Sequence, residues 1–293
     1  MKQFSLNIKG ERLPVDRPLV MGILNVTPDS FYAGSRTPAD SGEALRLRAE
    51  RLAAEGADLF DIGGYSTRPG AGKVSEAEEL RRIEAGIKAA RAAAPGIPVS
   101  VDTFRASVAR EAVAGLGADI VNDVSGGTLD AAMFDTVADL RCPYILMHMR
   151  GTPADMLSLT DYPAGVAAGV VAELSGKLRE LALRGVADVI VDPGFGFAKT
   201  AEQNYELMAA LPEVGRLLDR PMLVGVSRKS MIYRPLGITP AEALPGTTAL
   251  NVLALEGGAS ILRVHDVAEA AQAVKVWMMY DRFSGNKYNN SGL

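Results

Sequence analysis

Residues 185–194, Gly-Val-Ala-Asp-Val-Ile-Val-Asp-Pro-Gly, contain the unit that decides the fold of this chain. A glycine of the kind that ends a helix comes first, a short apolar strand follows, and the strand ends in a polar turn. The Gly-Val-Ala-Asp of residues 185–188 recurs in the shorter form Gly-Ala-Asp at residues 56–58 and 117–119. Because the strand is apolar throughout rather than alternating, it is typical of a parallel strand that is buried on both faces.

About eight such strands alternate with longer segments of helical pattern. The predicted strands are residues 19–24, 57–62, 97–102, 119–122, 144–148, 188–192, 222–226 and 260–265. The predicted helices between them include residues 42–55, 75–94, 106–116, 164–184 and 240–256. Eight β-then-α units without a linker favour a (β/α)8 TIM barrel over a doubly wound open sheet, which would usually have roughly five to seven strands and a phosphate-binding fingerprint.

The 293 residues are expected to form one domain, since α/β barrels of about 250 residues are routinely single domains. Residues 1–17 are predicted to form an N-terminal β-hairpin that plugs the N-terminal end of the barrel. The barrel itself is expected over residues 18–280, and residues 281–293 are expected to be a frayed tail.

Composition excludes several classes of function. The net charge of −4 does not indicate a nucleic-acid partner. The single cysteine, Cys142, rules out an internal disulfide and a thiolate metal cluster, and it predicts a cytoplasmic setting. The only histidines are His148 and His265, so a His-rich zinc site is not expected. No apolar run reaches the ~18 residues of a membrane span, and no signal peptide is recognised, so no membrane partner is expected.

Polar side chains follow the predicted strands, at the end of a barrel where catalytic residues lie. They include Asn25, Arg68, Asp102, Asn122, Asp192, Lys229, Arg263 and His265. The buried carboxylates and amides suit a flat polar heterocycle with donor groups. The cationic residues and the glycine-rich turns suit a phosphate or pyrophosphate, and Phe197 could pack against a flat ring.

Each of these residues alone has an ordinary structural explanation. Asp102, Asn25 and Asn122 could cap helices or brace turns, and Lys229 and Arg68 could be solvated surface groups. Their joint position at one end of the barrel is what favours a site.

Other polar residues are expected to be structural. His148 lies in an apolar run and is expected in the core or behind the site, while Asp123 is expected to brace a turn. Cys142 is expected to be inert. The alternating charges of residues 76–82 indicate a solvated helix face.

Several motifs together resemble those of the dihydropteroate synthase family. Met-Gly-Ile-Leu-Asn-Val-Thr-Pro-Asp-Ser-Phe at residues 21–31 and Gly-Gly-Tyr-Ser-Thr-Arg-Pro-Gly at residues 63–70 resemble the two pterin-binding signatures of that family. Further similar motifs, in the order of the family, are residues 192–197, 227–230 and 263–267. The resemblance extends from about Pro18 to Met279, and the family fold is a (β/α)8 barrel.

The resemblance implies a transferase of folate biosynthesis. Members condense 6-hydroxymethyl-7,8-dihydropterin pyrophosphate with 4-aminobenzoate, giving 7,8-dihydropteroate and pyrophosphate, with Mg2+ as cofactor. Sulfonamides mimic 4-aminobenzoate in this family. A homodimer is implied by the resemblance alone. The expected mechanism is dissociative: pyrophosphate leaves before the amine attacks, and no covalent enzyme intermediate forms.

The resemblance also implies a role for each candidate residue. The pterin would be bound by Asp102, Asn122, Asp192 and Lys229. The pyrophosphate would be bound by Asn25, Thr67, Arg68, Arg263 and His265, with Asn25 also a ligand of Mg2+. The 4-aminobenzoate would lie near Pro69, Phe197, Lys229 and Ser230, its carboxylate at the helix that begins there. The expected catalytic residues are Asp102, Lys229 and Arg68.

Three residues depart from the family pattern without removing a substrate contact. Tyr65 stands where many members have Glu, Arg150 where Gln is common, and Ala198 where Gly is frequent. One alternative is a methyltransferase domain that binds a pterin and passes the methyl group of methyltetrahydrofolate to a corrinoid protein. A second is a folate-binding protein without catalysis. The cationic strand ends favour the synthase, because methyl transfer has no pyrophosphate to neutralise.

Overall fold

The computed structural model describes residues 3–27, 42–65, 72 and 74–284, and their main body is a closed parallel barrel. Its strands are β3 (Leu19–Asn25), β4 (Leu59–Gly63), β5 (Val99–Asp102), β6 (Ile120–Asp123), β7 (Tyr144–Met147), β8 (Val189–Asp192), β9 (Leu223–Val224) and β10 (Ile261–Val264). They pair in the order β8-β7-β6-β5-β4-β3-β10-β9. A bridge between Val191 and Met222 joins the two ends of this order. The predicted (β/α)8 barrel is confirmed.

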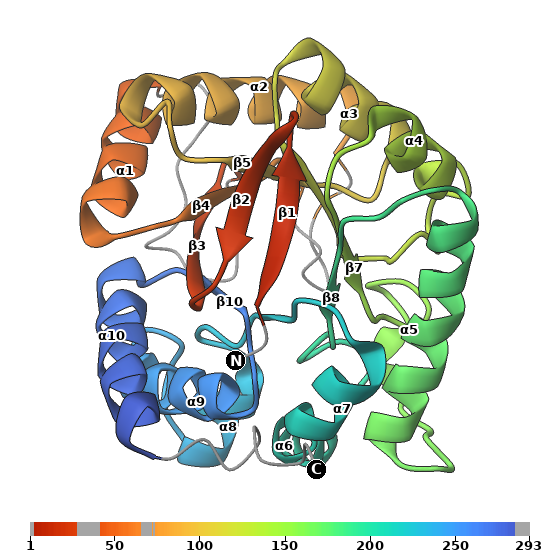
Figure 1. The fold of residues 1–293 in the computed structure, drawn as a ribbon, viewed down its shortest axis with the longest axis vertical. Helices are drawn as coiled ribbons and strands as arrows, with labels where there is room; N and C mark the ends of the chain where they lie inside the picture. Colours follow the sequence, from red (N-terminus) through yellow and green to blue (C-terminus); the bar gives the residue numbers. More distant parts are fainter. Residues whose placement is uncertain (1–2, 28–41, 66–71, 73, 285–293) are drawn as a thin grey trace.

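Helices surround the strands (Figure 1). They are α1 (Gly42–Glu55), α2 (Glu76–Ala93), α3 (Ala106–Arg110), α4 (Met133–Leu140), α5 (Val166–Leu183), α6 (Ala201–Ala209), α7 (Leu211–Leu218), α8 (Ser230–Leu236), α9 (Leu244–Glu256) and α10 (Val267–Phe283). A π-helical turn, Glu111–Gly115, continues α3, and a 3-10 turn, Met156–Ser158, precedes α5. The helix predicted at residues 240–256 begins later, at Leu244, where Pro245 lies in the first turn and favours a helix start.

The apolar pattern of the sequence did not predict α4, α6, α7 and α8, although the family resemblance implied a helix that begins at Ser230, where α8 starts. Each has at most nine residues, so its apolar periodicity extends over little more than two turns. A local signal for α6 was present in the sequence. Thr200 and Gln203 form a capping box, in which each side chain bonds to the backbone of the other residue.

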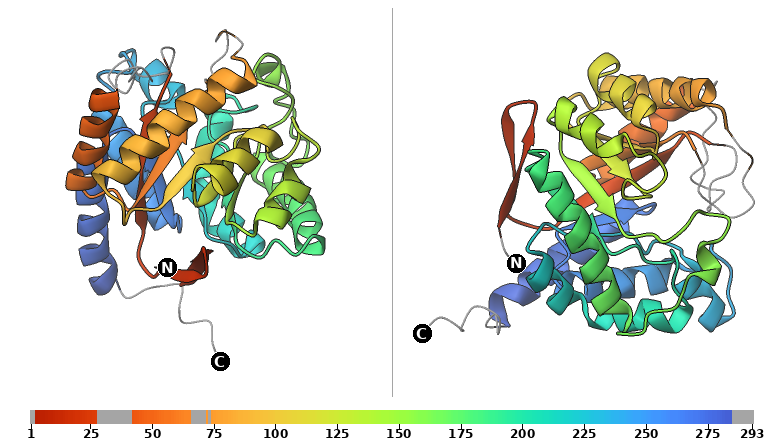
Figure 2. Two further views of the ribbon diagram at one scale, coloured as in Figure 1. Left: turned by 90° about the horizontal axis from the view of Figure 1, so that it is seen from above. Right: turned by 90° about the vertical axis from the view of Figure 1, so that its right-hand side faces the viewer.

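The N-terminal hairpin covers one end of the barrel. Its strands β1 (Phe4–Ile8) and β2 (Glu11–Val15) are antiparallel and pair Ile8 with Glu11, so Lys9 and Gly10 alone form the turn. Both turn residues have positive φ, as a type I′ turn requires. Figure 1 looks onto this hairpin in front of the barrel, and the right view of Figure 2 shows it to one side.

The hairpin contributes to the core inside the barrel. Leu6 and Val15 are at most 2% exposed and pack in one apolar cluster with inward-facing strand residues. Those residues are Leu19, Met21, Leu59, Ile120, Ile145, Ile190, Leu223 and Ile261. The predicted plug is therefore confirmed. The larger apolar cluster lies between the outer face of the strands and the helices.

The expectation of a solvated face at residues 76–82 is wrong at one position. Glu79 is fully buried, accepts a hydrogen bond from the hydroxyl of Thr103 at 2.6 Å, and forms an ion pair with Arg105. Burial raises the pKa of Glu79, while Thr103 and Arg105 lower it. The carboxylate of Glu79 can be buried because Thr103 and Arg105 stabilise its charge.

Within the described ranges, none of the helices combines the length and apolar character that a membrane crossing needs.

Candidate active site

One cavity of 420 Å3 opens at the carboxyl ends of the strands, which is a volume that suits a small organic substrate. All nine predicted site residues that the structure describes line it: Asn25, Asp102, Asn122, Asp192, Phe197, Lys229, Ser230, Arg263 and His265. The other three, Thr67, Arg68 and Pro69, lie outside the described residues. A second cavity, of 490 Å3, lies among α5, α6 and α7 and has none of the strand-end residues.

Asp102, Asn122 and Asp192 bring buried polar groups to the cavity. Asp102 ends β5 and pairs in register with Asn122 of β6, while Asp192 ends β8. Burial raises the pKa of Asp102 to about 7, although Arg263 opposes the shift. Burial also raises the pKa of Asp192, which Lys229 lowers. Carboxylates so poorly solvated are stabilised by donors or positive charge beside them.

Asp61, which lies within β4, contacts these side chains. It was not identified as a site residue from the sequence. It is fully buried, and its Oδ2 accepts hydrogen bonds from Arg263 Nε at 2.6 Å and from Asn122 Nδ2 at 3.1 Å. Arg263 also donates to Asp102 Oδ2 at 2.9 Å. A carboxylate between Phe60 and Ile62 in an apolar strand was the available signal, because such a group needs a buried partner.

Arg263 is therefore already part of two ion pairs. Two of its N–H groups bond to Asp61 and Asp102, and a guanidinium has five. The side chain of Arg263 lines the cavity, so its other N–H groups can reach a ligand there. Arg263 can consequently fix the position of Asp102 and still offer N–H groups to an anion.

Lys229 lies between the carboxylate of Asp192 and the loop that follows β8. Its Nζ donates to the backbone carbonyl of Phe195 and lies 4.8 Å from the centre of the Phe197 ring. Burial lowers the pKa of Lys229 to about 8, and Asp192 opposes the shift. The ammonium and the ring together suit a flat ligand with an acceptor edge.

Arg228 fixes the backbone that presents Lys229. It has a positive φ of 54° and forms a bidentate ion pair with Asp266 at 2.8 and 2.9 Å. Its Nη1 also donates to the carbonyls of Pro240 and Ala241. The side chain of Arg228 thus attaches the motif around Lys229 to the segment before α9 and to the turn after β10. This role of Arg228 was not predicted from the sequence.

His265, which the sequence places among the cationic or potentially cationic strand ends, is neutral in the free site. Burial and the neighbouring Arg263 lower the pKa of His265 to about 3. Ser227 Oγ lies 3.0 Å from His265 Nδ1 and accepts from the backbone N–H of His265 at 3.2 Å. The Ser227 hydroxyl can donate to Nδ1, and in that tautomer Nε2 of the neutral ring carries the proton and is a donor.

An apolar wall completes the cavity. Val124, Met147 and Met156 belong to one buried cluster, against which Phe197 packs. The same four residues line the cavity. This wall offers flat apolar surface for an aromatic substrate, beside the polar groups of Asp192 and Lys229.

Three other predictions concern residues outside the cavity lining. Asp123 bonds to the backbone N–H groups of Ser125 and Gly127 and to the hydroxyl of Tyr144, so it braces this turn as expected. His148 is 1% exposed, as expected for a residue behind the site. Cys142 is buried, and burial raises the pKa of its thiol to about 11, which fits an inert cysteine.

Oxygen donors at the end of β3 are suitable for a magnesium ion. Asn25 and Thr27 line the cavity, and the Thr27 hydroxyl is buried without a hydrogen-bond partner among the described residues. Over the same ranges, no group of three His, Cys, Asp or Glu residues could hold a metal. Mg2+ in phosphate-binding sites usually takes one or two protein ligands and completes its shell with substrate oxygens and water. The residues therefore fit a Mg2+ ion that arrives with a phosphorylated substrate.

Comparison with known proteins identifies the family of the chain. Residues 21–265 match the family model described as pterin binding enzyme. The dihydropteroate synthase of Synechocystis is 47% identical over 269 residues, which cover 89% of each chain.

Solved structures show the same similarity. The Yersinia pestis dihydropteroate synthase, in a complex with a sulfonamide drug, has a TM-score of 0.87 at 37% identity over 95% of this chain and 99% of that one. The Xanthomonas albilineans dihydropteroate synthase with 4-aminobenzoic acid has a TM-score of 0.84 at 42% identity over 96% and 99%. These relatives favour the synthase over the methyltransferase and non-catalytic alternatives. The chain belongs to the pterin binding enzyme family and, within it, to the dihydropteroate synthases.

Proposed function

We propose that the chain condenses 6-hydroxymethyl-7,8-dihydropterin pyrophosphate with 4-aminobenzoate to give 7,8-dihydropteroate and pyrophosphate. One observation supports this most directly. Buried carboxylates for a pterin, an apolar wall with the Phe197 ring for a benzoate and oxygen donors suited to Mg2+ all line the same 420 Å3 cavity. This reaction needs the three together, because it joins two flat rings and releases pyrophosphate.

The pterin is proposed to bind to Asp102, Asn122, Asp192 and Lys229. Asp192 would accept from the 2-amino group and N3–H of the ring, since Gly194 N–H holds its Oδ1 at 2.8 Å and orients the carboxylate. Lys229 would donate to the carbonyl and N5 edge of the pterin. Its ammonium lies close to Phe197, beside which the 4-aminobenzoate would lie, with its carboxylate near Ser230.

Pyrophosphate is proposed to bind near Asn25, Arg263 and His265, with Thr67 and Arg68 closing over it and Pro69 near the benzoate. The side chains of Arg263 and His265 line the cavity. Neutral His265 can donate from Nε2 without being charged. We propose that Asn25 holds the Mg2+ ion, which would neutralise negative charge on the leaving group.

The residues support a dissociative order of bond changes. The C–O bond to pyrophosphate breaks first, and positive charge then spreads from the exocyclic CH2 into the dihydropterin. Asp102 lies in a poorly solvated position, where an ionised carboxylate would strongly stabilise a cation beside it. The lone pair of the aromatic amine then forms the C–N bond, and the amine loses a proton.

The direct test is to incubate the protein with Mg2+ and both substrates and to measure dihydropteroate and pyrophosphate. Asp192→Ala and Lys229→Ala are expected to lose nearly all turnover while remaining folded. Near-normal turnover in both would contradict the site. A second incubation without 4-aminobenzoate tests the mechanism, because a pterin–protein adduct on the catalytic route would contradict it.

We also propose a homodimer. Supporting it are exposed apolar side chains on the neighbouring helices α9 and α10: Val252, Leu253, Val276, Met279, Tyr280 and Phe283. Light scattering is expected to give twice the mass of one chain, and Val276→Glu is expected to lower it. The cytoplasmic location stays a prediction that rests on the single cysteine.

A further inference from the structure

The loop that follows β8, residues 193–200, separates the substrate cavity from a buried polar network. On its cavity side, Phe197 packs against Lys229, and the carbonyl of Phe195 accepts a hydrogen bond from Lys229. The course of this loop therefore determines the position of two groups at the proposed 4-aminobenzoate subsite.

The backbone of the loop has an unfavourable path. Gly194, Gly196 and Ala198 all have positive φ, and alanine rarely adopts this left-handed conformation. A Cβ at Gly194 would lie 1.9 Å from the carbonyl oxygen of His148. Glycine tolerates this path but Ala198 does not favour it, so side-chain hydrogen bonds to the loop carbonyls are needed to stabilise it.

Lys199 supplies such bonds. It is 4% exposed, and its Nζ donates to the carbonyls of Gly194 at 2.9 Å and Phe197 at 3.0 Å. The same Nζ lies 3.0 Å from His148 Nδ1. An ammonium has three N–H donors, so these three acceptors use all of them. Two of the three are carbonyls of the loop itself.

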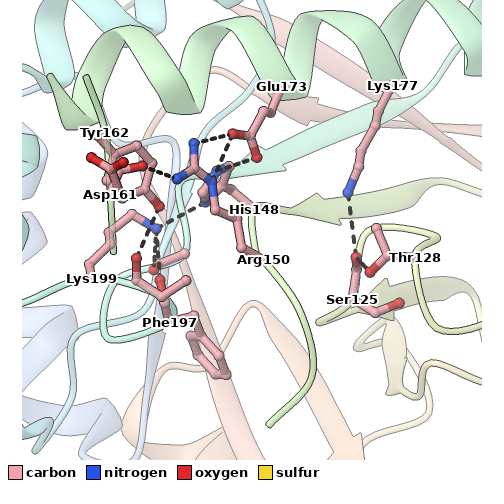
Figure 3. A network of polar contacts seen from close by, with 12 residues as sticks. Ser125, Thr128, His148, Arg150, Asp161, Tyr162, Glu173, Lys177, Phe197 and Lys199 are labelled. Carbon is pink, nitrogen blue, oxygen red and sulfur yellow. Dashed lines mark hydrogen bonds and ion pairs between the residues drawn. The ribbon is translucent and has the colours of Figure 1, made fainter. Parts of the chain in front are cut away.

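A chain of side chains behind the loop orients Lys199 (Figure 3). His148 Nε2 lies 3.1 Å from Glu173 Oε2, and Glu173 Oε1 accepts from Arg150 Nε at 2.9 Å. The guanidinium of Arg150 lies over the ring of Tyr162, whose hydroxyl donates to the carbonyl of Ala198 at 3.0 Å. The network therefore holds the loop at a third carbonyl as well.

The charges of the network agree with this pattern of donors. Burial lowers the pKa of His148 to about 4, so its ring is neutral and can accept at Nδ1 while Nε2–H donates to Glu173. Burial lowers the pKa of Lys199 to about 7 and Asp192 opposes the shift, so the ammonium with its three donors is the form present below about pH 7. The charged and titratable groups that face Lys199 are His148, Arg150, Glu173, Asp192 and Lys229.

We propose that Lys199 is a positioning residue for 4-aminobenzoate: by donating to the carbonyls of Gly194 and Phe197, it holds Phe197 and the Phe195 carbonyl against Lys229. This inference rests on the proposed function, and it adds a residue that does not line the cavity. Lys199 acts through the loop and touches neither substrate.

The test compares Lys199→Met with Lys177→Met. Lys177 is a suitable control, because it is a half-buried lysine of the same region but reaches Ser125 O, on another loop, at 3.5 Å (Figure 3). In Lys199→Met, the KM for 4-aminobenzoate is expected to rise at least about tenfold, since two carbonyls lose their donor. The KM for the pterin pyrophosphate is expected to stay within about threefold. Lys199→Gln, which keeps two donors, should lie between wild type and Lys199→Met.

Hydrogen exchange at the amides of residues 194–198 gives a second measurement that does not depend on activity. Exchange is expected to be faster in Lys199→Met and unchanged in Lys177→Met. If the wild type forms no dihydropteroate, the proposed function fails, while the exchange data still test the loop. Unchanged exchange, an equal rise in both KM values, or a fall in kcat alone would each overturn the inference. Should Lys199→Met not fold, Lys199→Gln and Tyr162→Phe must show the same selective rise in KM.

Discussion

As the pH falls from 7 to 5, the two histidines are expected to lower the free energy of unfolding, whereas Asp102, whose pKa is raised by burial to about 7, opposes this fall. Burial lowers the pKa of His148 to about 4 and that of His265 to about 3. In the unfolded chain, both titrate near the ordinary value of 6.5. Between pH 6.5 and 4 the unfolded chain thus binds more protons than the folded one, and the free energy of unfolding falls as the pH falls.

The size of the effect follows from the pKa values. At pH 5, which is about 1.5 units below the unfolded value, each buried neutral histidine should lower the free energy of unfolding by about 2 kcal/mol. The two together should account for about 4 kcal/mol. His148→Gln removes one titrating group and keeps a side chain that can donate to Glu173. Its free energy of unfolding should therefore fall by about 2 kcal/mol less than that of wild type between pH 7 and pH 5.

Urea unfolding measures this difference. The single tryptophan, Trp277, is 8% exposed and reports on the packing of α10. Free energies of unfolding at pH 7 and pH 5 would be compared for wild type and His148→Gln. Groups outside the network, including His265, titrate equally in both proteins, so the difference between them reports on His148 and its partners Glu173 and Lys199. If the free energy of unfolding falls equally in the two proteins between pH 7 and pH 5, the conclusion that His148 is neutral in the folded state is refuted.

Three further predictions concern the site. Asp61→Asn is expected to raise the KM for the pterin pyrophosphate about tenfold, because Arg263 loses one buried counter-charge; an unchanged KM would show that Asp61 does not position the site. Asp266→Ala is expected to lower the free energy of unfolding by about 3–5 kcal/mol, because it removes the carboxylate that pairs with the buried Arg228. An unchanged free energy of unfolding in urea would contradict this. Chelation of Mg2+ should stop turnover, and addition of Mg2+ should restore it. Asn25→Ala should require roughly tenfold more Mg2+ than wild type. Full turnover in the presence of chelator would exclude the proposed role of Mg2+.

The strands could be predicted from the sequence because each one is buried on both faces. Residues 144–148 and 188–192, for example, differ from β7 and β8 by one residue at one end. The segment predicted at 222–226 is shorter in the structure, since only Leu223 and Val224 pair with β10. Short helices such as α7 (Leu211–Leu218) were missed because two turns contain too few residues to show a period.

The site could be predicted where a residue stands at the end of a strand, as Asp102 and Asp192 do. Asp61 was missed because it lies within β4, where its partner Arg263 is 202 residues away in the chain and is brought near only by closure of the barrel. The protonation state of His265 was also beyond sequence reasoning. It depends on burial and on Arg263, and both follow from the folded structure.

The structure also changes the view of how the site attracts an anion. The sequence indicates a group of cations at the strand ends, yet Arg263 is paired with Asp61 and Asp102, and Asp192 lies close enough to Lys229 to affect its pKa. With His265 neutral, the strand-end residues that the structure describes have little uncompensated positive charge, and the other cation of the lining, Arg234, is an exposed residue of α8. Binding of pyrophosphate at the strand ends therefore depends on directed N–H donors and on positive charge that arrives with the substrate. This favours a Mg2+–pyrophosphate complex as the species that binds, because a paired arginine offers donors without offering a free charge.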